Sequence, residues 1–294
     1  MVDKRIDTLT HLVKDWIESQ EKGSRFTSRQ LDSEIDIVTP EGKSIRRGVI
    51  KEYCDSQKLQ RVKHLTGTYK ILDKEIEIMN FKHKNPEGWF DINYPFGLEQ
   101  YVRTPRRSLV VLGGSPQAGK SAFAHNIIRL NQNKGYKIYL WDSENSEAEI
   151  EERLSKHLSY QDWDDDLVRS RSANFEDVID PDALNIIDYL EAPENIWEIR
   201  TSLRNIRDRL NLGIAVIMLQ KPEGRDLPYG KEWAKQLPRL ALSIEAGILK
   251  ILKGKSWAQK DVNPDGLRWS FRLVQGEKFC NILPLGKEIT GKEF

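Results

Sequence analysis

The chain has 294 residues, of which 38% are hydrophobic and 31% are charged, so it can bury one large α/β domain together with a smaller one. Its charges nearly cancel to +1, so any contact with nucleic acid must come from local clustering and not from bulk charge. Only two cysteines occur, Cys54 and Cys280, without metal-ligand spacing, which argues against a disulfide framework or a zinc site.

The N-terminus lacks the apolar core of a secretion signal, and no run approaches about 18 consecutive apolar residues. These two features indicate neither secretion nor a membrane span. A reducing cytosol fits the cysteine content best, so we expect a cytoplasmic protein.

Three helices are predicted in the first part of the chain. Residues 6–20 carry apolar side chains at helical spacing. A second, short helix is expected after Thr27, whose hydroxyl can cap it. Pro40-Glu-Gly is expected to break the chain, and a third helix should run from about Ser44 to Ser56.

Two short β-prone runs follow between Leu59 and Leu72, about a Thr-Gly turn, and this pattern predicts a hairpin. Three helices followed by a hairpin resemble a winged helix-turn-helix domain, which we place at residues 1–73. The third helix and the hairpin form the most basic segment of the protein.

This basic segment is a candidate surface for duplex DNA. Arg46, Arg47 and Lys51 are expected to face a major groove from the third helix, and Lys63 and Lys70 to contact phosphates from the wing. Lys43 is a further candidate contact. The alternative is a small helical module that binds protein and carries solvated lysines.

Residues 74–88 are charged, poorly periodic and end in the turn signal Asn85-Pro-Glu-Gly, so they are predicted to be a linker. The second domain is then expected to span residues 89–294.

A phosphate loop is predicted near the start of this second domain. The apolar run 109–112 leads into Gly114-Ser-Pro-Gln-Ala-Gly-Lys-Ser, which has the Gly-x-x-x-x-Gly-Lys-Ser spacing of a Walker A motif. Its backbone N–H groups and the following helix N-terminus can bind phosphates, Lys120 can reach the β- and γ-phosphates, and Ser121 can hold Mg²⁺. The alternative is a glycine-rich turn that fits the pattern by chance. The predicted nucleotide-binding residues are Gly114, Ser115, Pro116, Gln117, Ala118, Gly119, Lys120, Ser121 and Ala122.

Strand-like and helix-like segments alternate downstream of this loop, which predicts a mostly parallel sheet with helices on both faces. Glu144, Asp188 and Gln220 fall at or just beyond the ends of predicted strands. Open α/β sheets bind their ligands at this edge.

Residues 89–98, 109–126, 140–146 and 186–190 resemble the RecA-like motor domain of DnaB-type hexameric replicative helicases and their phage and plasmid relatives. The resemblance implies an ATPase that uses Mg²⁺ and acts as a homo-oligomeric ring or filament. It also implies that Glu144 polarises the attacking water, that Asp188 is an outer-sphere partner of Mg²⁺, and that Gln220 senses the γ-phosphate.

Relatives in this family contact single-stranded DNA through the loop that follows the sensor glutamine. The corresponding candidates are Lys221, Arg225 and Lys231. A solvated surface loop is the alternative, because charge and glycine are common in loops.

The C-terminal region resembles the closing strands of the family but departs from it at one motif. Relatives carry Lys-x-Arg, whose arginine reaches the γ-phosphate of the neighbouring subunit, whereas this chain has Lys253-Gly-Lys255. A lysine supplies the charge without the bidentate fork, so Lys253 and Lys255 are the candidate trans-acting residues, with Arg268 or Arg272 as substitutes. The helical domain that binds primase in DnaB-type helicases is replaced by the winged-helix-like region.

Two acidic runs are predicted to be solvated: the helix face with Glu147, Glu149, Glu151 and Glu152, and the turn at residues 162–166.

Two functions are compatible with these features. The leading one is a DNA-dependent ATPase with a helicase or replication-initiation role. The alternative is a DNA-binding switch that ATP controls, with little hydrolysis and no unwinding.

Overall fold

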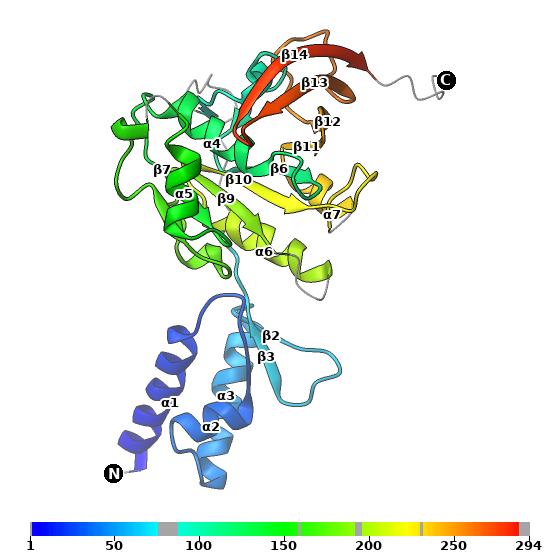
Figure 1. The fold of residues 1–294 in the computed structure, drawn as a ribbon. Helices are drawn as coiled ribbons and strands as arrows, with labels where there is room; N and C mark the ends of the chain where they lie inside the picture. The colour runs from blue at the N-terminus through cyan, green and yellow to red at the C-terminus, as the bar shows by residue number, and fades with distance from the viewer. Residues whose placement is uncertain (1, 76–87, 158–159, 192–195, 230–231, 288–294) are drawn as a thin grey trace. The chain divides into compact units, whose positions relative to one another are not determined.

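The computed structural model describes residues 2–75, 88–157, 160–191, 196–229 and 232–287. The chain divides into two compact units, Met1–His83 and Lys84–Phe294 (Figure 1). The predicted linker 74–88 crosses this division, and its residues 76–87 lie outside the described residues. Among the helices described, none has both the length and the apolar character needed to cross a membrane.

The N-terminal unit contains three helices and a small antiparallel sheet. Its elements are α1 (Val2–Ser19), β1 (Arg25–Thr27), α2 (Ser28–Glu34), α3 (Pro40–Asp55), β2 (Leu59–Arg61) and β3 (Thr68–Ile71). The predicted hairpin is confirmed, because β2 pairs antiparallel with β3. The three-residue strand β1, which was not predicted, pairs with the other edge of β3 and gives the sheet order β1-β3-β2.

Helix capping sets the boundaries of α2 and α3. The side chain of Thr27 accepts a hydrogen bond from the backbone N–H of Gln30, as predicted. The prediction that Pro40 breaks the chain was wrong: Pro40 begins α3, and Thr39 caps it by accepting from the N–H of Gly42 at 3.1 Å. A proline fits the first helical turn because the N–H that it lacks would have no partner there.

The core of this unit lies between α1, α3 and the sheet. Val13 and Ile17 of α1 pack with Val49 and Ile50 of α3 in one buried cluster. Apolar side chains at this helical spacing form the stripe that an amphipathic helix buries.

The C-terminal unit is built on a nine-stranded sheet, and the predicted α/β class is confirmed. The strand order is β14-β13-β12-β11-β6-β10-β9-β7-β8. The six strands from β11 to β8 in this order are parallel, and β12, β13 and β14 continue the sheet antiparallel. The strands are β6 (Ser108–Gly114), β7 (Ile138–Asp142), β8 (Val168–Ser170), β9 (Leu184–Leu190), β10 (Ile214–Gln220), β11 (Leu240–Glu245), β12 (Ile248–Gly254), β13 (Leu267–Val274) and β14 (Lys278–Lys287).

Within the described part of this unit, four α-helices accompany the sheet: α4 (Lys120–Asn131), α5 (Glu147–Leu154), α6 (Ile196–Arg209) and α7 (Glu232–Gln236). A two-stranded ribbon of β4 (Trp89–Phe90) and β5 (Thr104–Pro105) precedes β6, with the 3₁₀ segment η2 (Pro95–Gln100) between its strands. Two further 3₁₀ segments, η3 (Tyr160–Asp162) and η4 (Phe175–Asp177), flank β8.

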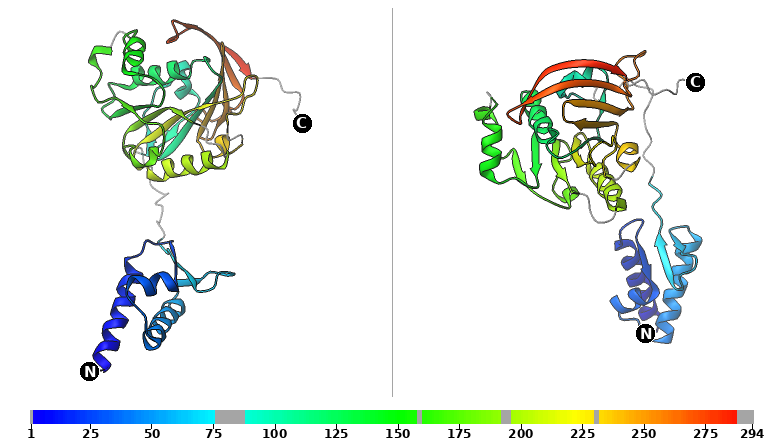
Figure 2. Two further views of the ribbon diagram at one scale, coloured as in Figure 1. Left: turned by 60° about the horizontal axis from the view of Figure 1, so that its bottom comes forward. Right: turned by 45° about the vertical axis from the view of Figure 1, so that its right-hand side comes forward.

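Alternate side chains of the central strands point to opposite faces of the sheet. Val110 and Leu112 of β6 belong to the buried cluster that includes Phe123 and Ile127 of α4. Leu109 and Val111 belong to a second cluster, which includes Ile199, Leu203 and Ile206 of α6. Figure 2 shows α6 lying along one face of the sheet. The strands are apolar on both faces because each face is covered by a helix.

Candidate nucleotide-binding site

The predicted phosphate loop connects β6 to α4. Gly114 ends the strand, Ser115–Gly119 form the loop, and residues 120–122 make the first turn of the helix. Gly119 has φ of 103°, which a residue with a side chain rarely adopts. A Cβ at Gly114 would lie 2.6 Å from Cγ of Lys120, so the close approach of this lysine requires glycine. The loop therefore has the backbone that a phosphate site needs.

Lys120 folds over its own loop. Its Nζ donates to the carbonyl oxygens of Ser115 at 3.1 Å and Gly114 at 3.3 Å. Burial lowers the pKa of Lys120, and the nearby carboxylates of Asp188 and Glu144 act in the opposite direction. The ammonium group is thus held at the loop by two backbone carbonyls.

A cavity of about 630 Å³ opens beside the loop, and nine predicted site residues line it, among them Pro116, Gln117, Gly119 and Ala122 of the loop region. Lys120 and Ser121 come from the start of α4, Glu144 from the loop after β7, Asp188 from β9, and Gln220 from the end of β10. The carboxyl ends of parallel strands meet at one edge of the sheet, which is why residues 100 positions apart converge here.

Ser121 and Asp188 are suited to a magnesium ion that accompanies a nucleotide. The hydroxyl of Ser121 donates to the Asp188 carboxylate, and Oδ2 of Asp188 is buried without a hydrogen-bond partner among the described residues. Burial raises the pKa of Asp188, so a cation beside it would favour its charged form. These two residues would hold Mg²⁺, which would neutralise phosphate charge there.

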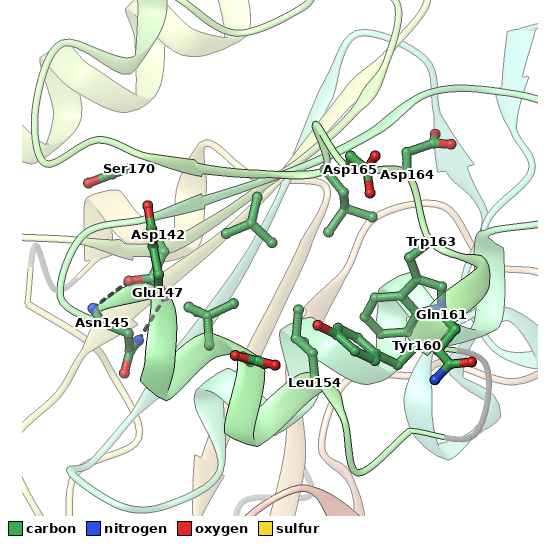
Figure 3. Close-up of a pocket in the computed structure, with 14 residues that line it drawn as sticks. Asp142, Asn145, Glu147, Leu154, Tyr160, Gln161, Trp163, Asp164, Asp165 and Ser170 are labelled. Carbon is green, nitrogen blue, oxygen red and sulfur yellow. Dashed lines mark hydrogen bonds between the residues drawn. The ribbon is translucent and has the colours of Figure 1, made fainter.

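The loop that carries Glu144 is shaped by Asp142, a residue that the sequence analysis did not single out. Asp142 is 3% exposed, and its Oδ1 accepts hydrogen bonds from the backbone N–H groups of Glu144 at 3.0 Å and Asn145 at 2.6 Å. Its Oδ2 accepts from the Asn145 side chain at 2.8 Å (Figure 3). Glu144 itself is exposed and accepts a hydrogen bond from the Tyr189 hydroxyl. Burial, with Glu144 nearby, raises the pKa of Tyr189 to about 12.

Figure 3 also shows the second cavity that Asp142 lines, of about 560 Å³, on the side of α5 where Trp163 and Tyr160 lie. Asp164 and Asp165 of the predicted acidic turn line this cavity together with Glu147 and Glu151. The turn therefore borders a cavity as well as solvent.

Gln220 lies beside the first glycine of the phosphate loop. In the parallel register of β10 with β6, Gln220 is opposite Gly114, and the N–H of Lys221 donates to the Gly114 carbonyl at 3.1 Å. Gln220 thus lies at the same part of the sheet edge as the phosphate loop, and both line the cavity.

The expectation that Lys221 faces single-stranded DNA was wrong. Its side chain is 0% exposed, because the ammonium is ion-paired with Glu245 and donates to the Arg225 carbonyl at 2.6 Å. Burial alone would raise the pKa of Glu245, but hydrogen bonds from Lys221 and Ser115 lower it. The side chain of Arg225 is exposed, and Lys231 lies outside the described residues.

Lys253 is engaged within its own chain. Its Nζ donates to the carbonyl oxygens of residues 235, 236 and 238 at 2.8, 2.5 and 2.8 Å, at the C-terminal end of α7. Burial, with Lys255 and Arg239 nearby, lowers the pKa of Lys253 to about 8. Lys255 is exposed. Of the two candidate trans-acting lysines, only Lys255 has an exposed side chain.

Several residues that line the nucleotide cavity were not predicted. Glu149 and Glu152 line it, although their face of α5 was predicted to be solvated. Arg153 and Lys156 line it as well. Lys156 donates to the carbonyl of Gln275, in the turn between β13 and β14. Other residues of this wall are Leu273, Gly276 and Glu277. The turn comes close to α5 only because of the sheet topology, since the two are more than 100 residues apart in the chain.

In the N-terminal unit, the candidate DNA contacts differ in exposure. Arg46 is 8% exposed, and its Nε lies 3.0 Å from Oδ1 of Asp32, so the expectation that it faces a groove was wrong. Arg47, Lys51 and Lys63 are exposed, whereas Lys43 and Lys70 are half-buried.

Comparison with known proteins complements this description. No protein-family model matches the chain, and no curated protein matches it either. Among solved structures, the KaiC-like protein PH0186 from the hyperthermophilic archaeon Pyrococcus horikoshii OT3 matches with 15% identity and a TM-score of 0.49, covering 67% of this chain and 98% of that chain. The C-terminal unit has the phosphate-loop strand β6 between β10 and β11, and Asp188 on β9 beyond β10. This arrangement is a mostly parallel α/β sheet with the predicted phosphate loop at the end of a central strand.

Proposed function

We propose that the protein is a DNA-dependent ATPase of the RecA/DnaB-like class, with a helicase or replication-initiation role in the cytoplasm. One observation carries the proposal: Lys120, Ser121, Glu144, Asp188 and Gln220 line a single cavity at the phosphate loop. A lone phosphate loop indicates nucleotide binding only. A carboxylate for the water and an amide at the γ-phosphate end add what hydrolysis requires.

Each residue has a distinct role in this proposal. Lys120 leaves the loop carbonyls to bind the β- and γ-phosphates, and Ser121 with Asp188 holds Mg²⁺. Glu144 orients the attacking water and accepts its proton, which its exposed carboxylate can do from the loop that Asp142 fixes. Gln220 reads the γ-phosphate. The site works between subunits of a ring or filament, with Lys255 the candidate contributor from the neighbour.

The N-terminal unit is proposed to be a winged-helix domain that binds duplex DNA. Its element order, α1-β1-α2-α3-β2-β3, and its sheet order, β1-β3-β2, support this assignment. Arg47 and Lys51 provide exposed cations on α3, and Lys63 one on the hairpin. Cations on a helix and on a wing are suited to groove and phosphate contacts.

Phosphate release with and without DNA tests the ATPase. We expect Lys120→Ala to lose both nucleotide binding and hydrolysis. Glu144→Gln should keep nucleotide binding and lose hydrolysis by at least about 100-fold, because it removes the general base alone. Glu151→Gln, on the neighbouring helix α5, is the matched control and should hydrolyse ATP normally. Unchanged DNA-stimulated phosphate release in Lys120→Ala would refute the proposal.

A second function is favoured by the engaged Lys253 and by the missing arginine of the Lys-x-Arg motif. In this alternative, the protein is a DNA-binding switch that acts as a loader, recruitment factor or defence sensor, and ATP controls its assembly with little turnover. Strand separation by the assembled protein distinguishes the two functions. Robust unwinding that depends on Glu144 would exclude the switch.

A further inference from the structure

Three buried side chains meet next to the nucleotide cavity. His125 lies on α4, His157 follows α5, and Glu277 lies in the turn between β13 and β14. Their side chains are 0%, 7% and 3% exposed. Buried polar groups of this kind require partners, because their desolvation is costly.

The distances between these side chains match those of a metal-ligand set. Oε2 of Glu277 lies 2.8 Å from Nδ1 of His125 and 3.5 Å from Nε2 of His157. One ligand atom from each residue can be chosen so that all three lie within 4.8 Å of one another. In a tetrahedral zinc site with bonds of about 2.0–2.1 Å, ligand atoms lie about 3.3 Å apart. The separations of 2.8 and 3.5 Å from Glu277 lie on either side of this spacing.

The hydrogen bonding around the cluster is incomplete without a further partner. Nε2 of His157 and Nε2 of His125 are buried and have no hydrogen-bond partner among the described residues. Two buried imidazole nitrogens thus remain available for a ligand in the cluster that contains the Glu277 carboxylate.

We propose that His125, His157 and Glu277 bind a divalent transition-metal cation, with Zn²⁺ the best fit. Two imidazole nitrogens and one carboxylate oxygen are a ligand set that zinc uses, whereas Ca²⁺ and Mg²⁺ prefer oxygen ligands. The cation would take the lone pair of His157 Nε2, which has no hydrogen-bond partner among the described residues. A fourth ligand is water or a group that enters from the nucleotide cavity, which Glu277 also lines.

The site would fasten the turn between β13 and β14 to the phosphate-loop helix. Asn126 of α4 already donates from Nδ2 to the Glu277 carbonyl at 2.8 Å. Gln275 and Gly276 of the same turn line the nucleotide cavity. A bound cation would therefore fix one wall of that cavity, whether or not the protein hydrolyses ATP.

Zinc titration of the full-length protein tests the proposal. After chelator treatment and dialysis, the wild type is expected to bind one zinc ion per chain, measured by elemental analysis. His157→Gln and Glu277→Gln should each weaken binding by at least about 10-fold, since loss of even an outer-shell partner costs that much. His64→Gln, which removes an exposed histidine of the N-terminal unit, is the matched control and should bind like wild type.

A cobalt titration of the wild type provides an independent measurement if either variant fails to fold. Co²⁺ bound in a tetrahedral site gives intense visible absorption, which zinc should abolish by displacement. Lys120→Ala should bind zinc normally, so failure of the ATPase proposal and failure of the metal proposal are distinguishable. Absence of zinc and cobalt binding by the folded wild type, or equal zinc affinity in wild type and in folded His157→Gln and Glu277→Gln, would overturn the metal site.

Discussion

The phosphate-loop edge of the sheet and the basic surface of the N-terminal unit hold their functional side chains in different ways. At the sheet edge, Lys120, Glu144 and Asp188 come from separate elements and line one cavity. In the N-terminal unit, Arg47 and Lys63 extend into solvent from α3 and from the hairpin. The sheet topology brings the side chains of the first site together. The second site is supported only by the positive charge of exposed side chains. The first site should therefore respond to single substitutions more strongly than the second.

The largest effect on stability is expected at the buried ion pair beside the phosphate loop. Glu245→Ala leaves the fully buried Lys221 ammonium without its partner, so we expect a loss of about 3 kcal/mol in the free energy of unfolding. Chemical denaturation measures it. Glu223→Ala, an exposed residue near Lys221, is the control and should change stability by no more than about 0.5 kcal/mol. Equal stability of the two variants would mean that the pair contributes little to the fold.

The next largest effect is expected on hydrolysis at the Glu144 loop. Asp142→Ala removes the acceptor that fixes the N–H groups of Glu144 and Asn145, so the loop loses its position. A misplaced catalytic group costs about 100-fold in rate, which is about 2.7 kcal/mol of activation free energy. Steady-state phosphate release at saturating ATP measures the loss. Asp165→Asn, in the same second cavity, should leave the rate unchanged, and an equal loss there would contradict a specific role for Asp142.

Neighbouring arginines on α3 provide a sharper comparison within the N-terminal unit. Arg46→Ala should lower the free energy of unfolding by about 2 kcal/mol, less than Glu245→Ala because it leaves behind an Asp32 carboxylate that is 17% exposed, whereas Glu245→Ala leaves a Lys221 ammonium that is 0% exposed. Arg47→Ala should leave stability within about 0.5 kcal/mol of wild type. It should instead weaken duplex binding and reduce the salt slope by about 0.9, the value for one lost phosphate contact. Unchanged DNA binding in Arg47→Ala would favour a protein-docking module.

The smallest effect is expected in the pH dependence of stability, because Lys253 is only half-buried and screening by solvent reduces what its pKa shift contributes. The pKa of Lys253 is lowered to about 8, below its ordinary value of 10.5. Between these two pH values the unfolded chain binds the proton more tightly, so this group makes the protein more stable as pH rises from about 8 to 10.5. Lys253→Met should lack this contribution, which thermal unfolding at several pH values measures. Parallel pH profiles for wild type and Lys253→Met would contradict it.

The sequence predicted the sheet and the phosphate loop well because both depend on local patterns. Apolar strands alternate with amphipathic helices, and the loop spacing is fixed by the close approach of Lys120 to Gly114. Polar residues at strand ends then converge because parallel strands share one edge. This rule alone was enough to predict that Glu144, Asp188 and Gln220 lie around one cavity.

The remaining features depend on contacts that no local pattern reports. His125 and Glu277 are 152 positions apart and meet only because the turn between β13 and β14 approaches α4. The side chains of Arg46 and Arg47 leave α3 in directions about 100° apart. Arg46 therefore lies in a buried ion pair, whereas Arg47 is exposed to solvent. The prediction at Pro40 was wrong because proline often ends a helix, and the local pattern does not show that Thr39 caps a helix that begins at Pro40. The prediction that Lys221 is exposed was wrong because its ion-pair partner Glu245 lies on another strand, where no local pattern indicates the pair.

The register of β10 with β6 has a consequence for how the state of a bound nucleotide reaches the rest of the domain. Gln220 and Gly114 are opposite each other in one ladder, and the N–H of Lys221, just beyond β10, donates to the Gly114 carbonyl. The phosphate loop is also joined to Lys221 through the Glu245 carboxylate, which accepts from the Ser115 hydroxyl and is ion-paired with Lys221. We therefore expect a movement of the phosphate loop to reach residues 221–229 through these two connections.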